Sequence, residues 1–233
     1  MSVKRHSNGS RARLQAWLRG WWAHCRLCGQ PGTELCADCL DQLPVLAMAC
    51  PGCARPLPVA GPRCGHCQRR APAFGRAWAA WRYAPPLDAL LPRIKYHGDL
   101  TLARWLGGLM AERLPAEDRA WAEGILPVPL HRWRLARRGF NQAVELARPC
   151  ARASGLPLLL NGVRRRRDTP AQVGQSLAAR RRNLRGCFEV TAALPRRVLL
   201  FDDVMTTGAT VEELARTLCR AGVETRVWAV ARA

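Results

Sequence analysis

The residues whose types and spacing point most directly to chemistry lie in the segment 198–210. Four apolar residues run into two adjacent carboxylates, Asp202 and Asp203, and a loop of small and hydroxyl-bearing residues follows shortly after. The residues of that loop are Thr206, Thr207, Gly208, Ala209 and Thr210. Residues 211–221 then show the apolar spacing of a helix. The segment therefore predicts a buried strand, an acidic edge, a short loop and a helix.

This order of elements predicts a sugar phosphate with a magnesium ion as the ligand. A parallel strand delivers its last side chains to the edge of the sheet where open α/β proteins bind ligands. Small residues let the backbone N–H groups of the loop surround a phosphate at the following helix N-terminus. The two carboxylates can accept hydrogen bonds from sugar hydroxyls and support Mg²⁺ directly or through water. The alternative is a tight turn with two solvated aspartates.

The ends of the predicted helix support its position beside the loop. Thr210 and Glu213 have the spacing of a capping box, in which each side chain accepts a hydrogen bond from the other's backbone N–H group. Gly222 stands where a glycine commonly follows the last helical residue. We therefore expect the helix to begin near Thr210 and to end just before Gly222.

Eight of the eleven cysteines form four Cys-x-x-Cys pairs before residue 68. Two thiolates at this spacing lie on one tight turn, so two pairs complete a closed tetrahedral zinc site. Sequential pairing predicts two Zn²⁺ sites, formed by Cys25, Cys28, Cys36 and Cys39 and by Cys50, Cys53, Cys64 and Cys67. Four thiolates leave no open position for a substrate, so both sites are predicted to be structural.

Two alternatives to this assignment stay open at the level of the sequence. A cross-braced arrangement uses the same eight cysteines, and their spacing does not distinguish it from sequential pairing. Disulfides are the second alternative, but an arginine-rich chain without an export signal is expected in a reducing cytoplasm. We therefore expect zinc, which would supply much of the folding free energy of this short segment.

Charge and hydropathy narrow the range of partners. The chain of 233 residues has 37 Lys and Arg against 17 Asp and Glu, a formal net charge of +20. Such a charge attracts polyanions, namely nucleic acid, pyrophosphate-bearing metabolites or acidic lipid surfaces. No apolar run reaches the ~20 residues of a membrane span, so no transmembrane segment is predicted. Residues 1–24 form a basic leader, which fits either a frayed segment or a short amphipathic helix at an anionic membrane.

Strand and helix patterns alternate from residue 78 onwards. Strands are expected at 78–83, 124–130, 158–160, 187–190, 197–201 and 223–231, and helices at 86–96, 100–114, 139–154, 176–184 and 211–221. Residues 131–138 are expected to form a basic loop. The alternation predicts an α/β domain whose mostly parallel sheet is covered by helices on both faces. The predicted domains are the leader at 1–24, a double zinc ribbon module at 25–70 and the α/β domain at 76–233.

The segment 198–210 resembles the phosphoribosyl pyrophosphate (PRPP) binding motif of type I phosphoribosyltransferases. That motif is a hydrophobic strand, two acidic residues, two further residues and Thr-Thr-Gly-x-Thr. With the cysteine pairs and the runs Val-Pro-Leu at 128–130 and Arg-Arg-Gly-Phe-Asn-Gln at 137–142, residues 25–233 are similar to the ComF family. The resemblance implies a phosphoribosyltransferase-like fold and a connection with DNA uptake in natural competence or with DNA utilisation.

The same resemblance implies roles for residues outside the acidic motif. In phosphoribosyltransferases the loop after the corresponding strand faces the pyrophosphate, which makes Val128, Pro129 and Leu130 candidates for PRPP binding. Arg137 and Arg138 are the arginines expected on the pyrophosphate, because a planar guanidinium binds two phosphate oxygens and keeps its charge. Lys95 is either an anion contact or a surface lysine at a helix end.

The resemblance further implies that residues 176–184 occupy the position of the flexible catalytic loop in type I enzymes. They include Arg180, Arg181 and Arg182. A mobile loop with these side chains would exclude water when it closes over PRPP. Binding of single-stranded DNA is the rival use of the same charges.

Two functions of different classes follow. The first is transfer of a phosphoribosyl group from PRPP, with Mg²⁺, to an unassigned acceptor, Asp202 and Asp203 being the catalytic residues. The second is a non-catalytic competence protein that handles single-stranded DNA, or that docks competence or DNA-processing proteins through its zinc module. The expected location is the cytoplasm, with contact at the inner face of the membrane as an option.

Overall fold

The computed structural model describes residues 24–59, 61–168 and 183–233. The chain divides into two compact units, one that ends at Leu43 and one that comprises Pro44–Ala233. The first unit contains the helix α2 (Ala37–Asp41) and the first four cysteines of the paired set. The boundary at Leu43 lies between the two cysteine groups, whereas the sequence suggested one module over residues 25–70. The second cysteine group therefore belongs to the same compact unit as the sheet.

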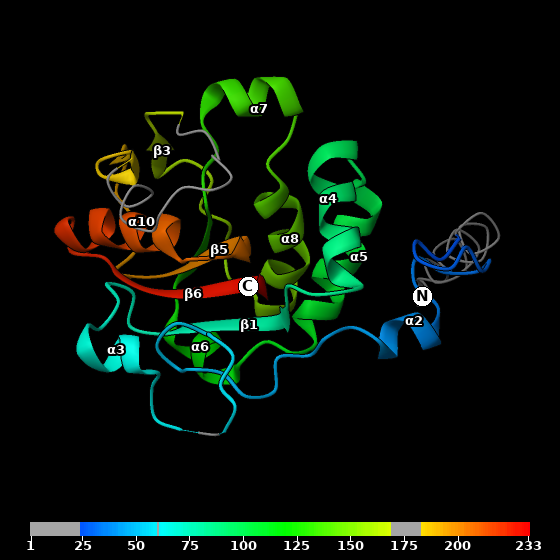
Figure 1. The fold of residues 1–233 in the computed structure, drawn as a ribbon. Helices are drawn as coiled ribbons and strands as arrows, with labels where there is room; N and C mark the ends of the chain where they lie inside the picture. Colours follow the sequence, from blue (N-terminus) through cyan, green and yellow to red (C-terminus); the bar gives the residue numbers. More distant parts are fainter. Residues whose placement is uncertain (1–23, 60, 169–182) are drawn as a thin grey trace, which may run out of the picture. The chain divides into compact units, whose positions relative to one another are not determined.

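Four parallel strands form the main sheet in the order β1, β6, β5, β2 (Figure 1). The strands are β1 (Ala77–Arg82), β2 (Gly124–Pro127), β5 (Arg197–Met205) and β6 (Glu224–Arg232). In the centre of the sheet Leu200 pairs with Leu126 on one side and with Val227 on the other. The parallel α/β sheet predicted from the alternating pattern is confirmed, and the acidic pair forms part of its central strand β5.

The two faces of β5 meet different helices. Val198 and Leu200 belong to a buried cluster with Leu214 and Leu218 of α10 (Ala209–Arg220). The opposite face lies against α8 (Gln142–Ser154), which contacts both β5 and β2. Successive side chains of a strand point to opposite faces. Asp202 therefore belongs to the face of α10, and Asp203 belongs to the face of α8.

Helices α4 (Leu87–His97) and α5 (Leu100–Ala111) lie on the α8 side of the sheet, and α5 packs against α8. Gly98 separates α4 from α5 with a φ of 66°, a conformation that glycine adopts without steric cost. Asp99 then caps α5 by accepting a hydrogen bond from the Leu102 N–H group at 3.1 Å. Both helices lie close to their predicted positions, and a short helix that was not predicted, α6 (Ala116–Trp121), precedes β2.

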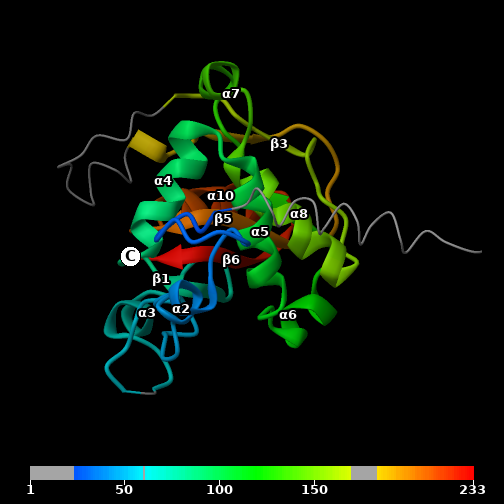
Figure 2. The same cartoon turned by 90° about the vertical axis from the view of Figure 1, so that its right-hand side faces the viewer.

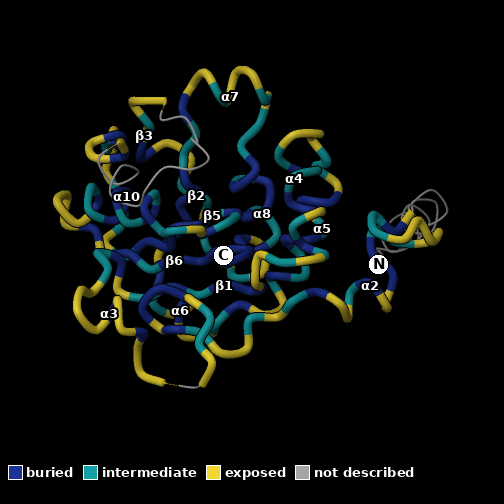
Figure 3. Tube along the Cα trace, viewed as in Figure 1, coloured by how far each residue is buried: buried dark blue, intermediate teal, exposed yellow. Residues whose placement is uncertain are grey.

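The segment after β2 is a helix and not the predicted loop. It forms α7 (Arg132–Arg138), which Gly139 ends with a φ of 78°. Every residue of α7 is exposed or half-buried (Figure 3). Arg, Leu and Ala favour helices intrinsically. Because α7 packs no apolar stripe against the core, the periodicity by which a helix is usually recognised is missing.

A two-stranded antiparallel hairpin lies beside the main sheet, formed by β3 (Val163–Arg165) and β4 (Phe188–Val190). Residues 158–160, expected to form a strand, make only an isolated parallel β-bridge, between Leu158 and Ile125. The basic helix predicted at 176–184, with Arg180, Arg181 and Arg182, lies outside the described residues except for its last two positions. Residues 1–23 of the predicted leader lie outside them as well.

The chain that leads to the second cysteine group runs along the edge strand β1. Val45 forms an antiparallel bridge with Trp81, and the Leu46 N–H group donates to the Ala80 carbonyl oxygen at 3.2 Å. The helix α3 (Gly65–Arg69) follows inside the cysteine group and lies on the β1 side of the sheet in both views (Figures 1 and 2). Among the described residues, no helix is long and apolar enough to span a membrane.

Candidate functional site

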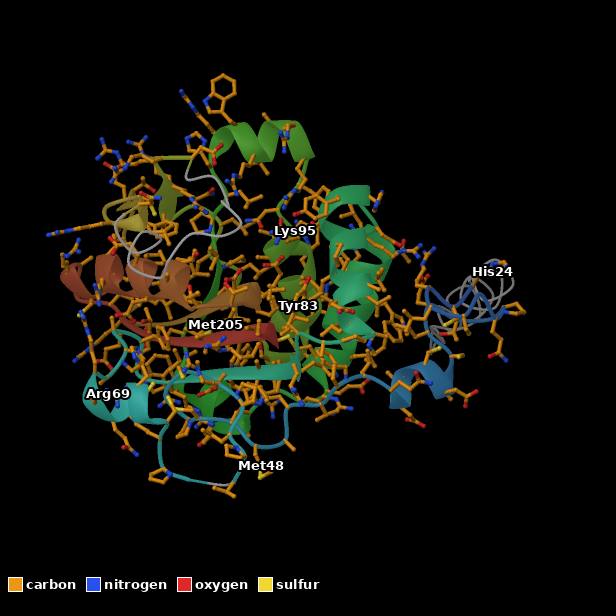
Figure 4. The ribbon with its side chains drawn as sticks, in the orientation of Figure 1. His24, Met48, Arg69, Tyr83, Lys95 and Met205 are labelled. Atoms are coloured by element: carbon orange, nitrogen blue, oxygen red, sulfur yellow. The ribbon has the colours of Figure 1, made fainter. Side chains whose placement is uncertain are left out.

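The acidic pair lies where the end of β5 meets helices α4 and α8. Asp203 is only 6% exposed. Its Oδ2 atom lies 3.3 Å from the Lys95 ammonium nitrogen, and it accepts a hydrogen bond of 3.3 Å from the Gln142 side-chain amide. Lys95 comes from α4 and points towards α8 (Figure 4). Three elements that are distant in sequence therefore converge on one carboxylate.

The two carboxyl groups have opposite electrostatic environments. Burial raises the pKa of Asp202 well above its usual range, and the charge of Asp203 raises it further. Burial also opposes ionisation of Asp203, but the Lys95 ammonium and the Val204 N–H group outweigh it and lower the pKa of Asp203. At neutral pH Asp203 is the ionised partner of Lys95. A divalent cation beside Asp202 would favour the carboxylate form of that residue too.

The loop that follows β5 turns at a glycine in the left-handed conformation. Gly208 has a φ of 77°, and a Cβ atom at this position would meet the Met205 methyl group at 3.1 Å. The Ala209 N–H group donates to the Thr207 hydroxyl at 3.3 Å, and α10 begins at Ala209. The residues predicted to bind phosphate therefore stand at the N-terminus of a 12-residue helix, where the helix dipole favours an anion.

The predicted capping box is wrong. Gly208 is the N-cap residue of α10, so Thr210 already lies within the helix. The Glu213 carboxylate is buried and accepts a hydrogen bond of 2.7 Å from the Gly186 N–H group. A tertiary contact to the segment before β4 thus replaces the local contact that the spacing suggested.

The loop after β2 lies at the same edge of the sheet as the aspartates. The Val128 N–H group donates to the Phe201 carbonyl oxygen at 2.8 Å. The Val128 carbonyl oxygen accepts a hydrogen bond of 3.0 Å from the Asn141 side chain, which also caps α8. Val128 is therefore placed next to the residue that precedes Asp202, and Pro129 and Leu130 follow it in the chain.

The two predicted arginines have different surroundings. Arg138 donates to the Gln142 side-chain oxygen, and its guanidinium carbon lies 5.9 Å from the centre of the Tyr96 ring. Since Gln142 in turn donates to Asp203, Arg138 is connected to the acidic pair through one side chain. Arg137 is exposed on α7, and among the described residues it has no contact with the pair.

Three residues around the aspartates did not emerge from the sequence as members of the site. Lys95 was left open between an anion contact and a surface lysine, Tyr96 was not given a role of its own, and Gln142 was noted only as part of the run that opens a helix. Each contact depends on the packing of α4 and α8 against the sheet. The Asn-Gln pair at the start of α8 was the one local signal, because Asn141 is a favoured N-cap residue and places Gln142 at the first helical position.

The first cysteine group lies in the unit that ends at Leu43. Ligand atoms of Cys25, Cys28, Cys36 and Cys39 lie within 4.8 Å of one another, and the Cys28 and Cys36 sulfurs are 3.6 Å apart. Tetrahedral zinc with Zn–S bonds of about 2.3 Å requires sulfurs about 3.8 Å apart. Burial and the neighbouring sulfurs raise the pKa of Cys39 to about 12, so a cation is needed for all four to be thiolates. The group fits Zn²⁺.

The second cysteine group has the same internal geometry within the core of the larger unit. Cys50, Cys53, Cys64 and Cys67 are buried, with ligand atoms within 4.8 Å of one another. The Cys53 and Cys64 sulfurs are 3.7 Å apart. A Cβ atom at Gly52 would lie 3.2 Å from the Cys67 sulfur, so the turn approaches the group closely. Both groups follow the sequential assignment of the cysteine pairs, and each could hold one zinc ion.

The parallel sheet with flanking helices and the two groups of four cysteines define an α/β protein of phosphoribosyltransferase-like fold with a zinc ribbon. No protein-family model matches the chain. Competence protein F of Haemophilus influenzae is 39% identical over 160 residues, which cover 65% of this chain and 70% of that protein. DNA utilization protein YhgH of Escherichia coli K12 is 34% identical over 156 residues, or 64% of this chain and 69% of that protein. Competence protein ComFC of Streptococcus pneumoniae is 26% identical over 63% of each chain. The chain belongs to the ComF family.

Proposed function

We propose that this protein binds PRPP with Mg²⁺ and transfers its phosphoribosyl group to an acceptor that is not assigned. The names of its relatives, which refer to competence and to DNA utilization, support a role in DNA uptake or in the use of DNA as nucleotides. One observation carries the proposal. The ionised Asp203, its neighbour Asp202 and the loop at the start of α10 lie at the same end of β5.

In this proposal each part of the ligand has a protein partner. The 5′-phosphate binds the N–H groups and hydroxyls of the loop from Thr206 to Thr210. Asp202 and Asp203 accept hydrogen bonds from the ribose hydroxyls. The loop of Val128, Pro129 and Leu130, which lies at the same sheet edge, receives the pyrophosphate. Mg²⁺, when bound, neutralises part of the pyrophosphate charge.

The charged side chains near the acidic pair would support the reaction. Departure of pyrophosphate leaves positive charge on the anomeric carbon, which nearby carboxylates stabilise. Asp203 is suited to this role because Lys95 keeps it ionised. Arg138, which donates a hydrogen bond to Gln142 beside Asp203, would balance the negative charge that accumulates on the leaving group.

Calorimetric titration of the full chain with PRPP, with and without Mg²⁺, tests this function. We expect binding that requires Mg²⁺ and that weakens by about tenfold or more in Asp203→Asn. Glu224→Gln is the matched control, since it removes a carboxylate charge at the amino end of β6, where the side chain is 56% exposed. Unmeasurable binding to the wild-type protein would reject the proposal, and so would equal affinities of wild type and Asp203→Asn.

A second candidate function is binding of single-stranded DNA without catalysis. The net charge of +20 favours it, and so does a cavity of about 680 Å³ beside β3. The cavity is lined by Arg132, Arg148, Arg164, Arg165 and Arg166. Arginines that contact DNA phosphates release counterions, so the logarithm of the affinity falls with the logarithm of salt concentration.

Two sets of substitutions locate such a DNA contact. If the cavity binds DNA, Arg164→Gln with Arg166→Gln should make the salt dependence shallower by about one unit for each lost contact. The triple substitution of Arg180, Arg181 and Arg182 by Gln should do so if the segment 176–184 is the contact. An unchanged slope in either variant excludes the corresponding residues, and Asp203→Asn should leave DNA affinity intact.

A further inference from the structure

Arg232, the last residue of β6, has a buried guanidinium that donates hydrogen bonds to several main-chain carbonyl groups. The residue is 2% exposed. Its Nε atom donates to the Cys53 carbonyl oxygen at 3.0 Å, and its Nη1 atom donates to the Met205 carbonyl oxygen at 2.8 Å. Nη1 also contacts the carbonyl oxygens of Thr206 and Ala233. One side chain therefore joins the second cysteine group to the end of β5.

The carbonyl groups on both sides of Arg232 belong to sites described above. Cys53 is a member of the second cysteine group, while Met205 (Figure 4) and Thr206 lead directly into the loop proposed to hold the phosphate. A buried cation is costly unless its donors are satisfied. The Arg232 guanidinium needs both carbonyl groups as acceptors, so it couples the orientation of the Cys53 carbonyl to that of the Met205 carbonyl.

A second contact joins the same two regions. The Ala73 N–H group, a few residues after the cysteine group, donates to the Glu212 carboxylate at 2.9 Å. Glu212 lies in the first turn of α10, directly after the loop. A small cavity of about 90 Å³ is lined by Cys53 and Cys67 on one side and by Thr207 and Gly208 on the other. The second cysteine group and the loop are therefore direct neighbours.

The turn at Cys53 makes hydrogen bonds within the second cysteine group. Ala54 has a φ of 54°, which is uncommon for a residue with a Cβ atom. Its N–H group donates to the Cys50 carbonyl oxygen at 2.7 Å, and the Cys64 N–H group donates to the Cys50 sulfur at 3.2 Å. A metal ion that joins the four sulfurs would hold this turn closed. Loss of the ion would release the turn and the carbonyl group that Arg232 needs.

We propose that metal binding at Cys50, Cys53, Cys64 and Cys67 fixes the phosphate loop through Arg232. In this role Arg232 is a positioning residue, which orients the main chain of Met205 and Thr206. The first cysteine group belongs to the other compact unit and serves as an internal control. The coupling of metal to loop conformation stands by itself, whereas its effect on PRPP affinity rests on the proposed function.

Hydrogen exchange of the full-length, zinc-loaded protein tests the coupling without any ligand. The variants are Arg232→Met, the pair Cys64→Ser and Cys67→Ser, and the matched control pair Cys36→Ser and Cys39→Ser, each with its zinc content measured. Arg220→Met is the control for loss of an exposed arginine. We expect amides of residues 205–210 to exchange about tenfold or more faster in Arg232→Met and in the second-group pair, but at the wild-type rate in both controls.

A chelator experiment keeps the proposal testable if Arg232→Met or the pair Cys64→Ser and Cys67→Ser fails to fold. In the protein with Cys36→Ser and Cys39→Ser, zinc remains at the second group alone, so its removal can be assigned. We expect its release to speed exchange at 205–210, and PRPP to slow that release, because coupling between two sites is reciprocal. Unchanged exchange at 205–210 after zinc release would overturn the proposal. Failure of the wild-type protein to bind PRPP would instead overturn the proposed function, and exchange would still decide the coupling.

Discussion

The Lys95 ammonium nitrogen lies 3.3 Å from the Asp203 carboxylate, and this ion pair joins helix α4 to the end of the central strand. Burial favours the neutral amine, but the Asp203 charge outweighs it and raises the pKa of Lys95. The pKa of Asp203 is lowered in turn, with burial opposing and Lys95 favouring its ionisation. The pair is therefore ionised over the whole neutral range.

Lys95→Met should destabilise the protein by about 2 kcal/mol at pH 7, because it leaves the Asp203 carboxylate buried without its cation. A carboxyl group with a lowered pKa contributes stability above its unfolded pKa and loses it as the pH falls through the folded value. Without Lys95, burial favours the neutral carboxyl group, so Asp203 takes up its proton at a higher pH in the variant than in the wild type. The difference in stability should therefore be largest where Asp203 is ionised in both proteins and should shrink as the solution is acidified towards the lowered pKa of the wild type.

Urea unfolding of wild type, Lys95→Met, Asp203→Asn and the double variant measures this coupling as a double-mutant cycle. The cycle removes effects of each substitution that do not involve the pair. A coupling energy near zero at pH 7, or one that grows as the solution is acidified, would contradict the assignment of the ion pair.

Gly107 allows α5 and α8 to approach each other closely. A Cβ atom at this position would lie 2.3 Å from the Leu146 carbonyl oxygen. Gly107→Ala should therefore separate the helices and destabilise the protein by about 2 kcal/mol or more. Gly108→Ala is the control, since its Cβ atom has nothing within 4 Å and should gain about 1 kcal/mol of helix propensity. Thermal and urea unfolding distinguish the two, and equal effects would exclude the close contact.

Asp118 is a fully buried carboxylate beneath the sheet. It accepts hydrogen bonds from the Trp228 indole nitrogen at 2.9 Å and from Arg226 at 2.8 Å. Asp118→Asn should cost about 3 kcal/mol in urea unfolding, because the buried charge that pairs with the partly exposed Arg226 and with Arg76 is lost. Glu117→Gln, next to it but with a side chain 60% exposed, should change stability by less than about 1 kcal/mol. A variant Asp118→Asn as stable as wild type would be incompatible with this network.

The unpaired cysteines should differ strongly in reactivity. Burial raises the pKa of Cys150 to about 12, and it raises the pKa of Cys187 to about 11 although Arg165 opposes it. Both thiols are therefore protonated at pH 8, whereas Cys219 is exposed. Since the thiolate is the nucleophile, iodoacetamide should label Cys219 in the zinc-loaded protein and spare Cys150 and Cys187. Peptide mass spectrometry reads out the sites, and rapid labelling of Cys150 in the folded state would refute its burial.

Local sequence patterns were sufficient for the parts of the fold in which neighbours in sequence are neighbours in space. The run from Val198 to Ala221 holds a strand, a loop and a helix in one continuous segment, and the structure forms them in that order. The Cys-x-x-Cys pairs are also local, because each pair occupies one turn. Their grouping into two sets matches the sequential assignment, for which the sequence left an alternative.

The remaining features depend on contacts between distant segments, which a single sequence does not encode visibly. Helix α7 buries no residue and has no apolar stripe, so the spacing of apolar residues did not predict a helix there. Glu213 has the spacing of a capping residue, but its carboxylate accepts a hydrogen bond from the Gly186 N–H group, which is distant in sequence. Lys95 and Gln142 reach Asp203 only because α4 and α8 pack on the same face of the sheet. In each case tertiary packing overrode or created the relevant interaction.

The segment that precedes the second cysteine group lies along the outer edge of β1, with hydrogen bonds from Leu46 and Arg82 joining the two. An uncovered outer strand is a template for pairing with another molecule. The second cysteine group anchors this covering segment at its far end. Without the metal the segment would be released, and the edge strand β1 would be free to pair with another molecule. Treatment with a chelator should accordingly cause self-association as well as loss of order. Zinc at the second cysteine group would then protect the protein from aggregation through β1.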